Sequence, residues 1–323
     1  MSREAFEARY AADWRRFEDL LGRLERFRRG AAARGPAGAG EFPALYRRVC
    51  HQLALARERS YGADLEQRLN HLALRGHQQL YRTEGPSWRG IGEFLAAGFP
   101  AKVRAEARLV LAAAALLVLP GLATGTAVGL RPELVYSVME GDAVRELEQM
   151  YQPDGEIERT SDSDLMMFGF YVYNNVGIAF RTFAAGVLLG LGSVFFLVHN
   201  GLYLGAVTGF LHQADLGGTF YPFVIGHAAF ELPAIVLAGA AGLRLGLAVL
   251  APGRRSRTAA LFATARGSLP LIYGTAFLLL VAAFVEAFWS STTSVPAGVR
   301  YAVGAGAWVA FFAYVLLGGR RAA

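Results

Sequence analysis

Glu231 lies within a long apolar stretch, residues 221–250, where a carboxylate is costly. The other ionisable residues of this stretch are His227, four positions earlier, and Arg244. Residues four apart share one face of a helix. A charged group near the centre of a bilayer costs at least about 2.5–3.5 kcal/mol, so it is kept where it has a partner or a task. The spacing therefore predicts a functional or paired His–Glu face on a membrane helix.

Further polar residues interrupt other apolar segments of the chain: Asn174, Asn175, Arg181 and Glu286. We expect them to converge with His227 and Glu231 toward the outer leaflet. One interpretation is a structural ion pair, Arg181 with Glu231 or Glu286, because a buried carboxylate needs an opposite charge or a proton. The others are a site for a lipid headgroup, proton or solute, and a metal or catalytic site.

The motifs do not favour chemistry at this cluster. His227 and Glu231 supply two ligands on one helix face, whereas a protein zinc site normally has three or four, and the sequence HExxH is absent. No nucleotide-binding loop, nucleophile elbow or cysteine cluster occurs. We therefore predict no catalytic residues, no metal and no cofactor, and a protein that is not an enzyme. An intramembrane hydrolase is a distant alternative.

Composition indicates a cytosolic segment joined to a polytopic membrane domain. Of the 323 residues 54% are hydrophobic and 38 are glycine, yet the first hundred residues are highly charged. Cys50 is the single cysteine, which excludes an internal disulfide and fits a reducing compartment. The net charge is +6, and most of the basic excess should face the cytoplasm rather than a nucleic acid. No motif typical of a nucleic-acid-binding protein is present. The start of the chain lacks the apolar core of a signal peptide.

Residues 1–100 predict a cytosolic region of amphipathic helices. Apolar residues recur every three or four positions in residues 1–30, after Phe42, and again in residues 65–81. A glycine- and alanine-rich linker, residues 30–40, follows the first helix. These helices suffice for a small bundle, and residues 88–100 favour a helix in the membrane interface.

Residues 101–323 predict a domain of about six transmembrane helices. The expected spans are 109–130, 176–198, 201–213, 222–250, 268–289 and 298–318. An acidic loop, residues 131–165, should be translocated to the outer side, with an interfacial helix at 166–175. The third span falls short of the roughly 20 residues that cross a bilayer. A full crossing nevertheless gives six passes, which leave Arg254, Arg255 and both termini on the cytoplasmic side as the positive-inside rule requires.

Glycines recur at helical spacing in the membrane domain: Gly186, Gly190, Gly201, Gly205, Gly209, Gly239, Gly242 and Gly246. Small residues four apart allow helix backbones to approach closely in lipid. Tight packing within one chain is the favoured interpretation, and a homodimer seam is the alternative.

Five stretches together resemble the stage II sporulation protein M family of integral membrane proteins: FPALYRRVCHQLALAR (42–57), LEQRLNHLALRGHQQLY (65–81), YNNVGIAFRTFAAGVLLGLGSVFFLVHNGLYLGA (173–206), GHAAFELPAIVLAGAAGLRLGLAVLAPG (226–253) and AAFVEAFWS (282–290). The motif residues that match are Asn174, Asn175, Asn200, Gly201, His227 and Glu231. The resemblance implies an all-α protein with six spans in the bacterial inner membrane.

The resemblance also implies a role and its partners. It indicates a non-enzymatic scaffold or subunit of a cell-envelope-associated complex. Its partners would be the lipid bilayer, membrane or envelope proteins and an AAA-type ATPase system, with a homodimer open and no nucleic acid. The alternative is a transporter or lipid translocator that uses the polar cluster of Arg181, His227, Glu231 and Glu286.

Overall fold

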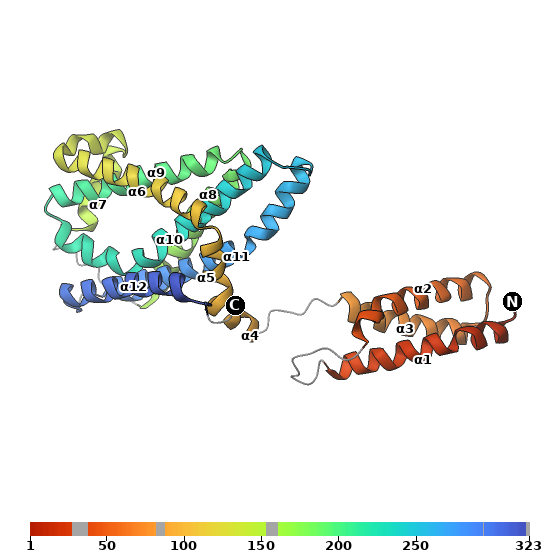
Figure 1. Cartoon of the computed structure of the whole chain (residues 1–323). Helices are drawn as coiled ribbons and strands as arrows, with labels where there is room; N and C mark the ends of the chain where they lie inside the picture. The colour runs from red at the N-terminus through yellow and green to blue at the C-terminus, as the bar shows by residue number, and fades with distance from the viewer. Residues whose placement is uncertain (28–37, 82–87, 153–160, 293, 321–323) are drawn as a thin grey trace. The chain divides into compact units, whose positions relative to one another are not determined.

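The protein was analysed as a computed structural model that describes residues 1–27, 38–81, 88–152, 161–292 and 294–320. Every regular element among these residues is helical, which confirms the predicted all-α class. Contacts divide the chain into two units, Met1–Ser87 and Trp88–Ala323 (Figure 1). Most of the predicted linker (30–37) and part of the predicted acidic loop (153–160) lie outside the described residues.

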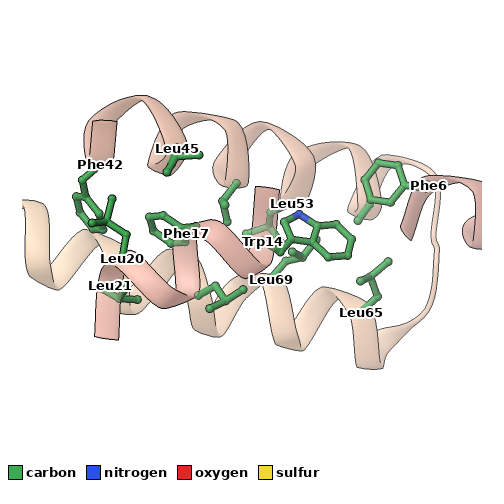
Figure 2. Packing of buried hydrophobic residues seen from close by; sticks show 13 residues of the cluster. Phe6, Trp14, Phe17, Leu20, Leu21, Phe42, Leu45, Leu53, Leu65 and Leu69 are labelled. Atoms are coloured by element: carbon green, nitrogen blue, oxygen red, sulfur yellow. The ribbon is translucent and has the colours of Figure 1, made fainter. Parts of the chain in front are cut away.

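The first unit is a bundle of three helices, coloured red to orange in Figure 1. They are α1 (Arg3–Phe27), α2 (Phe42–Glu58), which follows a short 3₁₀ turn, η1 (Ala39–Glu41), and α3 (Ala63–Tyr81). Their apolar stripes meet in one core, and Figure 2 shows Trp14 and Phe17 of α1 between the other two helices. Phe6 and Phe17 are fully buried, as the helical spacing predicts.

The core of this unit contains one polar pair. Trp14 is 1% exposed and its indole Nε1 donates a 2.7 Å hydrogen bond to Oε1 of Gln52, which is 3% exposed. A buried donor without a partner would cost about 1–3 kcal/mol, so Gln52 lets the large ring remain inside. The unit therefore has a complete core of its own.

Three short elements begin the second unit: α4 (Trp88–Glu93), the π-helical segment η2 (Phe94–Gly98) and α5 (Phe99–Ala105). The sequence groups residues 88–100 with the N-terminal region, whereas these residues belong to the second unit. Phe99 is fully buried in a cluster with Leu237, Leu271 and Phe311. This segment is thus anchored by packing against the long helices of the unit.

Five described helices are long and apolar enough to cross a membrane: α6 (Ala107–Leu130), α9 (Leu191–Gln213), α10 (Gly217–Leu250), α11 (Arg257–Phe284) with its π-helical end η5 (Val285–Ser290), and α12 (Ala297–Leu317). A sixth long helix, α8 (Ser161–Ala184), packs against α10 and α11. The bundle therefore has the predicted membrane-protein architecture.

The second and third predicted spans, 176–198 and 201–213, have the wrong boundaries. α8 ends at Ala184, a 3₁₀ turn η4 (Ala185–Val187) follows, and α9 begins at Leu191 after Gly190, whose φ is 84°. An added Cβ at Gly186 would collide with the backbone of Gly242 on α10. Hydropathy alone does not show this break, because its residues are as apolar as the helices on either side.

Contacts at the helix ends define two faces of the second unit. At one, here called the Arg244 face, Arg104 of α5 donates to the carbonyl oxygen of Val315 of α12 (2.5 Å), and Arg244 of α10 pairs with Glu106. The α8–α9 turn also lies there, since Gly190 approaches Gly246. Both ends of the unit thus lie at one face, and α6, α8, α9, α10, α11 and α12 run between the faces.

The predicted acidic loop forms most of the opposite face, here called the Tyr151 face. It contains a 3₁₀ helix η3 (Pro132–Ser137) and α7 (Gly141–Met150). Val135 and Val144 are buried against Val128, Leu211 and other apolar residues at the ends of α6, α9 and α10. Despite their acidic residues, η3 and α7 each bury an apolar face, so residues 132–150 of the predicted loop are packed structure.

The glycines serve packing within the chain, as favoured from the sequence. A Cβ added at Gly121 of α6 would lie 3.1 Å from the carbonyl oxygen of Gly201 of α9. One added at Gly125 would lie 3.3 Å from the carbonyl oxygen of Gly205. Glycines on both helices thus allow α6 and α9 to touch backbone to backbone. The glycine spacing therefore carries no argument for a homodimer.

Candidate functional site

A cluster of three ionisable side chains lies between α10 and η5. His227 and Glu231 share a face of α10, with His227 Nε2 4.0 Å from a Glu231 carboxylate oxygen. Glu286 comes from η5, and one ligand atom from each of the three residues lies within 4.8 Å of the others. The structure therefore brings together two segments that are separated by more than fifty residues of sequence.

The π-helical end of α11 directs two polar side chains toward α10. Glu286 is 8% exposed and Ser290 is 2% exposed. Ser290 Oγ lies 3.2 Å from His227 Nδ1. Gly226 faces the same segment, since an added Cβ there would be in ordinary van der Waals contact with Val285 and Trp289. π-Helical segments occur frequently at functional sites.

α8 adds the paired asparagines to the cluster. Asn175 is 3% exposed and its amide lies beside the Glu286 carboxylate. Asn174 Nδ2 donates a 2.9 Å hydrogen bond to Asn175 Oδ1 and so orients the second amide. The two amides are thus hydrogen-bonded to each other beside the Glu286 carboxylate.

Aromatic residues cover the cluster at the Tyr151 face. The Phe223 ring packs edge-on against His227 with the centroids 5.4 Å apart, and Tyr151 lies 6.1 Å from Phe223. Burial raises the pKa of the Tyr151 phenol, and the nearby Glu286 charge adds to this. Thr219 donates a 2.6 Å hydrogen bond to the Tyr151 carbonyl oxygen and holds α7 over α10.

Arg181 is not part of this cluster, so the pairing with Glu231 or Glu286 is wrong. It is exposed, and its Nε donates a 3.0 Å hydrogen bond to the carbonyl oxygen of Gly177. Because α8 ends at Ala184, Arg181 lies in its last turn, near the Arg244 face. Six residues of helix, about 9 Å, separate it along the axis from Asn175.

The family-motif residues Asn200 and Gly201 also lie elsewhere. Asn200 Nδ2 donates a 2.6 Å hydrogen bond to the carbonyl oxygen of Phe196 within α9. Gly201 is buried at the seam with α6, opposite Gly121. Both residues therefore belong to the packing of α9 rather than to the polar cluster.

A cavity of about 660 Å³ lies between α6, α9, α10 and α12. Apolar side chains and glycines line it, among them Leu111, Gly125, Pro233 and Trp308. His227, Glu231 and Glu286 do not line it. The carboxylates of Glu231 and Glu286 lie next to each other and to His227, and they do not line this cavity.

Sequence reasoning missed Tyr151 and Ser290 as parts of the site. Ser290 ends the AAFVEAFWS stretch and falls four residues after Glu286, so a helical reading places both on one face. Tyr151 carries no such signal, because its position depends on the fold of the acidic segment. Chemically, the site offers one imidazole and two carboxylates. Among the described residues, no Lys or Arg forms an ion pair with either carboxylate.

Comparisons with known proteins agree with the division into two units. A family model described as stage II sporulation protein M matches residues 109–291. A model described as a domain of unknown function (DUF8413) matches residues 4–82, almost the whole three-helix bundle. Searches of curated proteins and of solved structures gave no significant match. Since the first match covers more than half of the chain, the protein belongs to the stage II sporulation protein M family.

Proposed function

We propose that this protein is a non-enzymatic membrane subunit of a cell-envelope complex. The membrane unit anchors it in the bacterial inner membrane, and the three-helix bundle presents a docking surface in the cytoplasm, where both termini lie. The observation that carries this proposal is the closure of His227, Glu231 and Glu286 on one another, away from the apolar cavity. A hydrophilic transport route needs such groups to line an open passage.

The first unit supports a docking role because it is a separate unit with its own hydrophobic core. Its core is complete, and a separate family model matches it. Leu74 on α3 is 54% exposed, one of two exposed large apolar side chains among the described residues of this unit, with Met1. An apolar residue on an otherwise charged helix surface suits a contact with another protein.

The family resemblance supplies the partner class. We expect membrane or envelope proteins that work with an AAA-type ATPase system, and contact with them through the bundle. α6 and α12 expose apolar side chains, among them Leu111 and Val309, and this surface suits contact with lipid. A second copy of the chain would be another occupant of that surface.

Quantitative co-purification in mild detergent tests the proposal. The tagged full chain should capture a reproducible set of envelope proteins, and a chain without residues 1–87 should lose them. Leu74→Glu should reduce capture several-fold, whereas Gln67→Glu, an exposed residue on the same helix, should not. Equal capture by the shortened chain would exclude docking through the bundle.

A lipid translocator is the second candidate, and the apolar cavity favours it. Its size and lining suit acyl chains. The purified chain in vesicles that contain a fluorescent phospholipid decides between the two. We expect no translocation above that of empty vesicles. Translocation that is lost in a Trp308→Ala variant would assign the cavity to lipid movement instead.

A further inference from the structure

We propose that His227, Glu231 and Glu286 bind one divalent transition-metal ion, such as Zn²⁺, between α10 and η5. The three side chains offer one nitrogen and two oxygen atoms within 4.8 Å of one another. Imidazole and carboxylate together suit zinc, manganese and ferrous iron. The helix face of His227 and Glu231 supplies two ligands, and the fold adds the third.

Glu286 is the first argument that a ligand is missing. The residue is only 8% exposed, and one of its carboxylate oxygens, Oε2, is buried without a hydrogen-bond partner. Buried polar atoms in proteins are almost always bonded, because leaving one without a partner is unfavourable. The Asn175 amide lies beside this side chain, yet Oε2 is without a hydrogen-bond partner. A cation at the cluster would supply the missing partner.

The orientation of His227 is the second argument. Its Nδ1 lies 3.2 Å from Ser290 Oγ, and its Nε2 faces Glu231 at 4.0 Å. Histidines that bind a metal commonly donate their other ring N–H to a hydrogen-bond acceptor, which fixes the tautomer. In the tautomer with hydrogen on Nδ1, the Nε2 lone pair points at the carboxylate. A cation between the two atoms turns this repulsion into attraction.

The charges of the cluster are the third argument. Glu231 and Glu286 carry two negative charges when ionised, and no described Lys or Arg pairs with either. Arg300 lies in the first turn of α12. Its guanidinium donates hydrogen bonds to the carbonyl oxygens of Ser290, Thr292 and Val295. A divalent cation would neutralise both carboxylates. The rival explanation is that the carboxylates are protonated.

The geometry suits a site with one open coordination position. Zn–N and Zn–O bonds of about 2.1 Å set ligand atoms about 3.4 Å apart in a tetrahedron, so the three groups would close by roughly 1 Å on binding. Three protein ligands leave a fourth position for water, and the Glu231 side chain is still 20% exposed. The ion would fasten the π-helical end of α11 to the middle of α10.

Cobalt titration of the full chain in detergent, after treatment with a chelator, tests this site. Co²⁺ bound by nitrogen and oxygen ligands absorbs visible light, so binding is measured directly. We expect one Co²⁺ per chain, displaced by Zn²⁺. His227→Gln and Glu286→Gln should each weaken Co²⁺ binding by about tenfold or more. Glu133→Gln, at an exposed carboxylate in η3, is the matched control and should leave binding unchanged.

Either of two results in the Co²⁺ titration would overturn the proposal. One is the absence of stoichiometric Co²⁺ binding by the unaltered chain. The other is binding by Glu286→Gln as tight as that of Glu133→Gln. If the cluster variants do not fold, the unaltered chain still decides, since Zn²⁺ should raise its thermal midpoint and a chelator should reverse this. An infrared carbonyl band of protonated carboxylic acid that persists in excess Zn²⁺ would instead establish protonated carboxylates.

Discussion

Glu231 lies beside His227 of α10 and Glu286 of η5, and no guanidinium pairs with it among the described residues. His227 and Glu286 lie within 4.8 Å of it, whereas Arg181 sits in the last turn of α8 and bonds to its own helix. The only arginine in the same apolar stretch, Arg244, pairs with Glu106 at the other face. Charge compensation at Glu231 must therefore come from a proton or from a bound cation.

Substitution of Arg181 should have little effect on stability. We expect Arg181→Gln to shift the free energy of unfolding in detergent by less than about 0.5 kcal/mol, because the side chain is exposed and contacts only its own helix. Thermal unfolding followed by circular dichroism measures this.

Glu106→Gln is the matched comparison in the same assay. It removes the partner of Arg244 and Lys102, whose Nζ lies 2.8 Å from Glu106, and should cost about 1–3 kcal/mol. If Arg181→Gln lowers stability as much as Glu106→Gln, and adding Glu231→Gln recovers that stability, an ion pair between Arg181 and Glu231 would be supported.

At the scale of elements, close approach of helix backbones determines the bundle. α6 and α9 meet through Gly121, Gly125, Gly201 and Gly205, and the α8–α9 turn meets α10 through Gly186 and Gly242. In lipid, such packing replaces the hydrophobic effect as the driving force of helix association. The polar cluster is assembled by the direct packing of α10 on η5, where His227 contacts Ser290.

Gly205→Leu should separate α6 from α9. A side chain there would collide with the backbone of Gly121, and overpacking of this kind typically costs about 1–3 kcal/mol. The folded yield in detergent and the thermal midpoint should both fall. Gly129→Leu is the control on α6, because no atom lies within 4 Å of an added Cβ at that position. Equal effects of the two substitutions would mean that the seam is not tightly packed in solution.

At the scale of the whole molecule, two units with different solvents are joined in one chain. The bundle buries its aromatic and aliphatic side chains in a core, as a domain in water does. The membrane unit instead exposes apolar side chains such as Leu111 and Val309, which are 70% and 69% exposed. Each unit thus satisfies its own environment, and neither supplies the core of the other.

Residues 1–87 alone should therefore fold. We expect a helical circular dichroism spectrum and cooperative unfolding in urea. Phe17→Ala should lower the free energy of unfolding by about 3–5 kcal/mol, since its ring is fully buried. Arg47→Ala, at an exposed position of α2, should have little effect. An unstructured fragment would show that the bundle needs the membrane unit or a partner.

The orientation in the membrane is testable by cysteine labelling. In a Cys50→Ser background, a cysteine at Glu140 in the Tyr151 face should react with an impermeant maleimide on intact cells. A cysteine at Arg255, in the α10–α11 turn, should react only after the membrane is opened. These results follow from the positive-inside rule. The reverse pattern would invert the topology.

Much of the architecture was determined by the sequence alone. Periodic apolar residues such as Phe6 and Trp14 identify the amphipathic helices of the bundle, and long apolar runs identify the membrane helices, because burial in a core and in lipid each impose a simple pattern. The motif His227-x-x-x-Glu231 likewise follows from helical spacing. Local rules therefore sufficed for the class of protein and for one face of the site.

Only the tertiary structure decided where α8 ends, that Arg181 lies away from Glu231, and that Ser290 joins the cluster. It also decided that η3 and α7 of the acidic segment pack on the bundle and that Tyr151 covers the site. The physical reason is that these features depend on contacts between distant segments. A glycine-mediated approach of two helices or a π-helical end leaves hydropathy unchanged, yet it moves a side chain to another depth or another face.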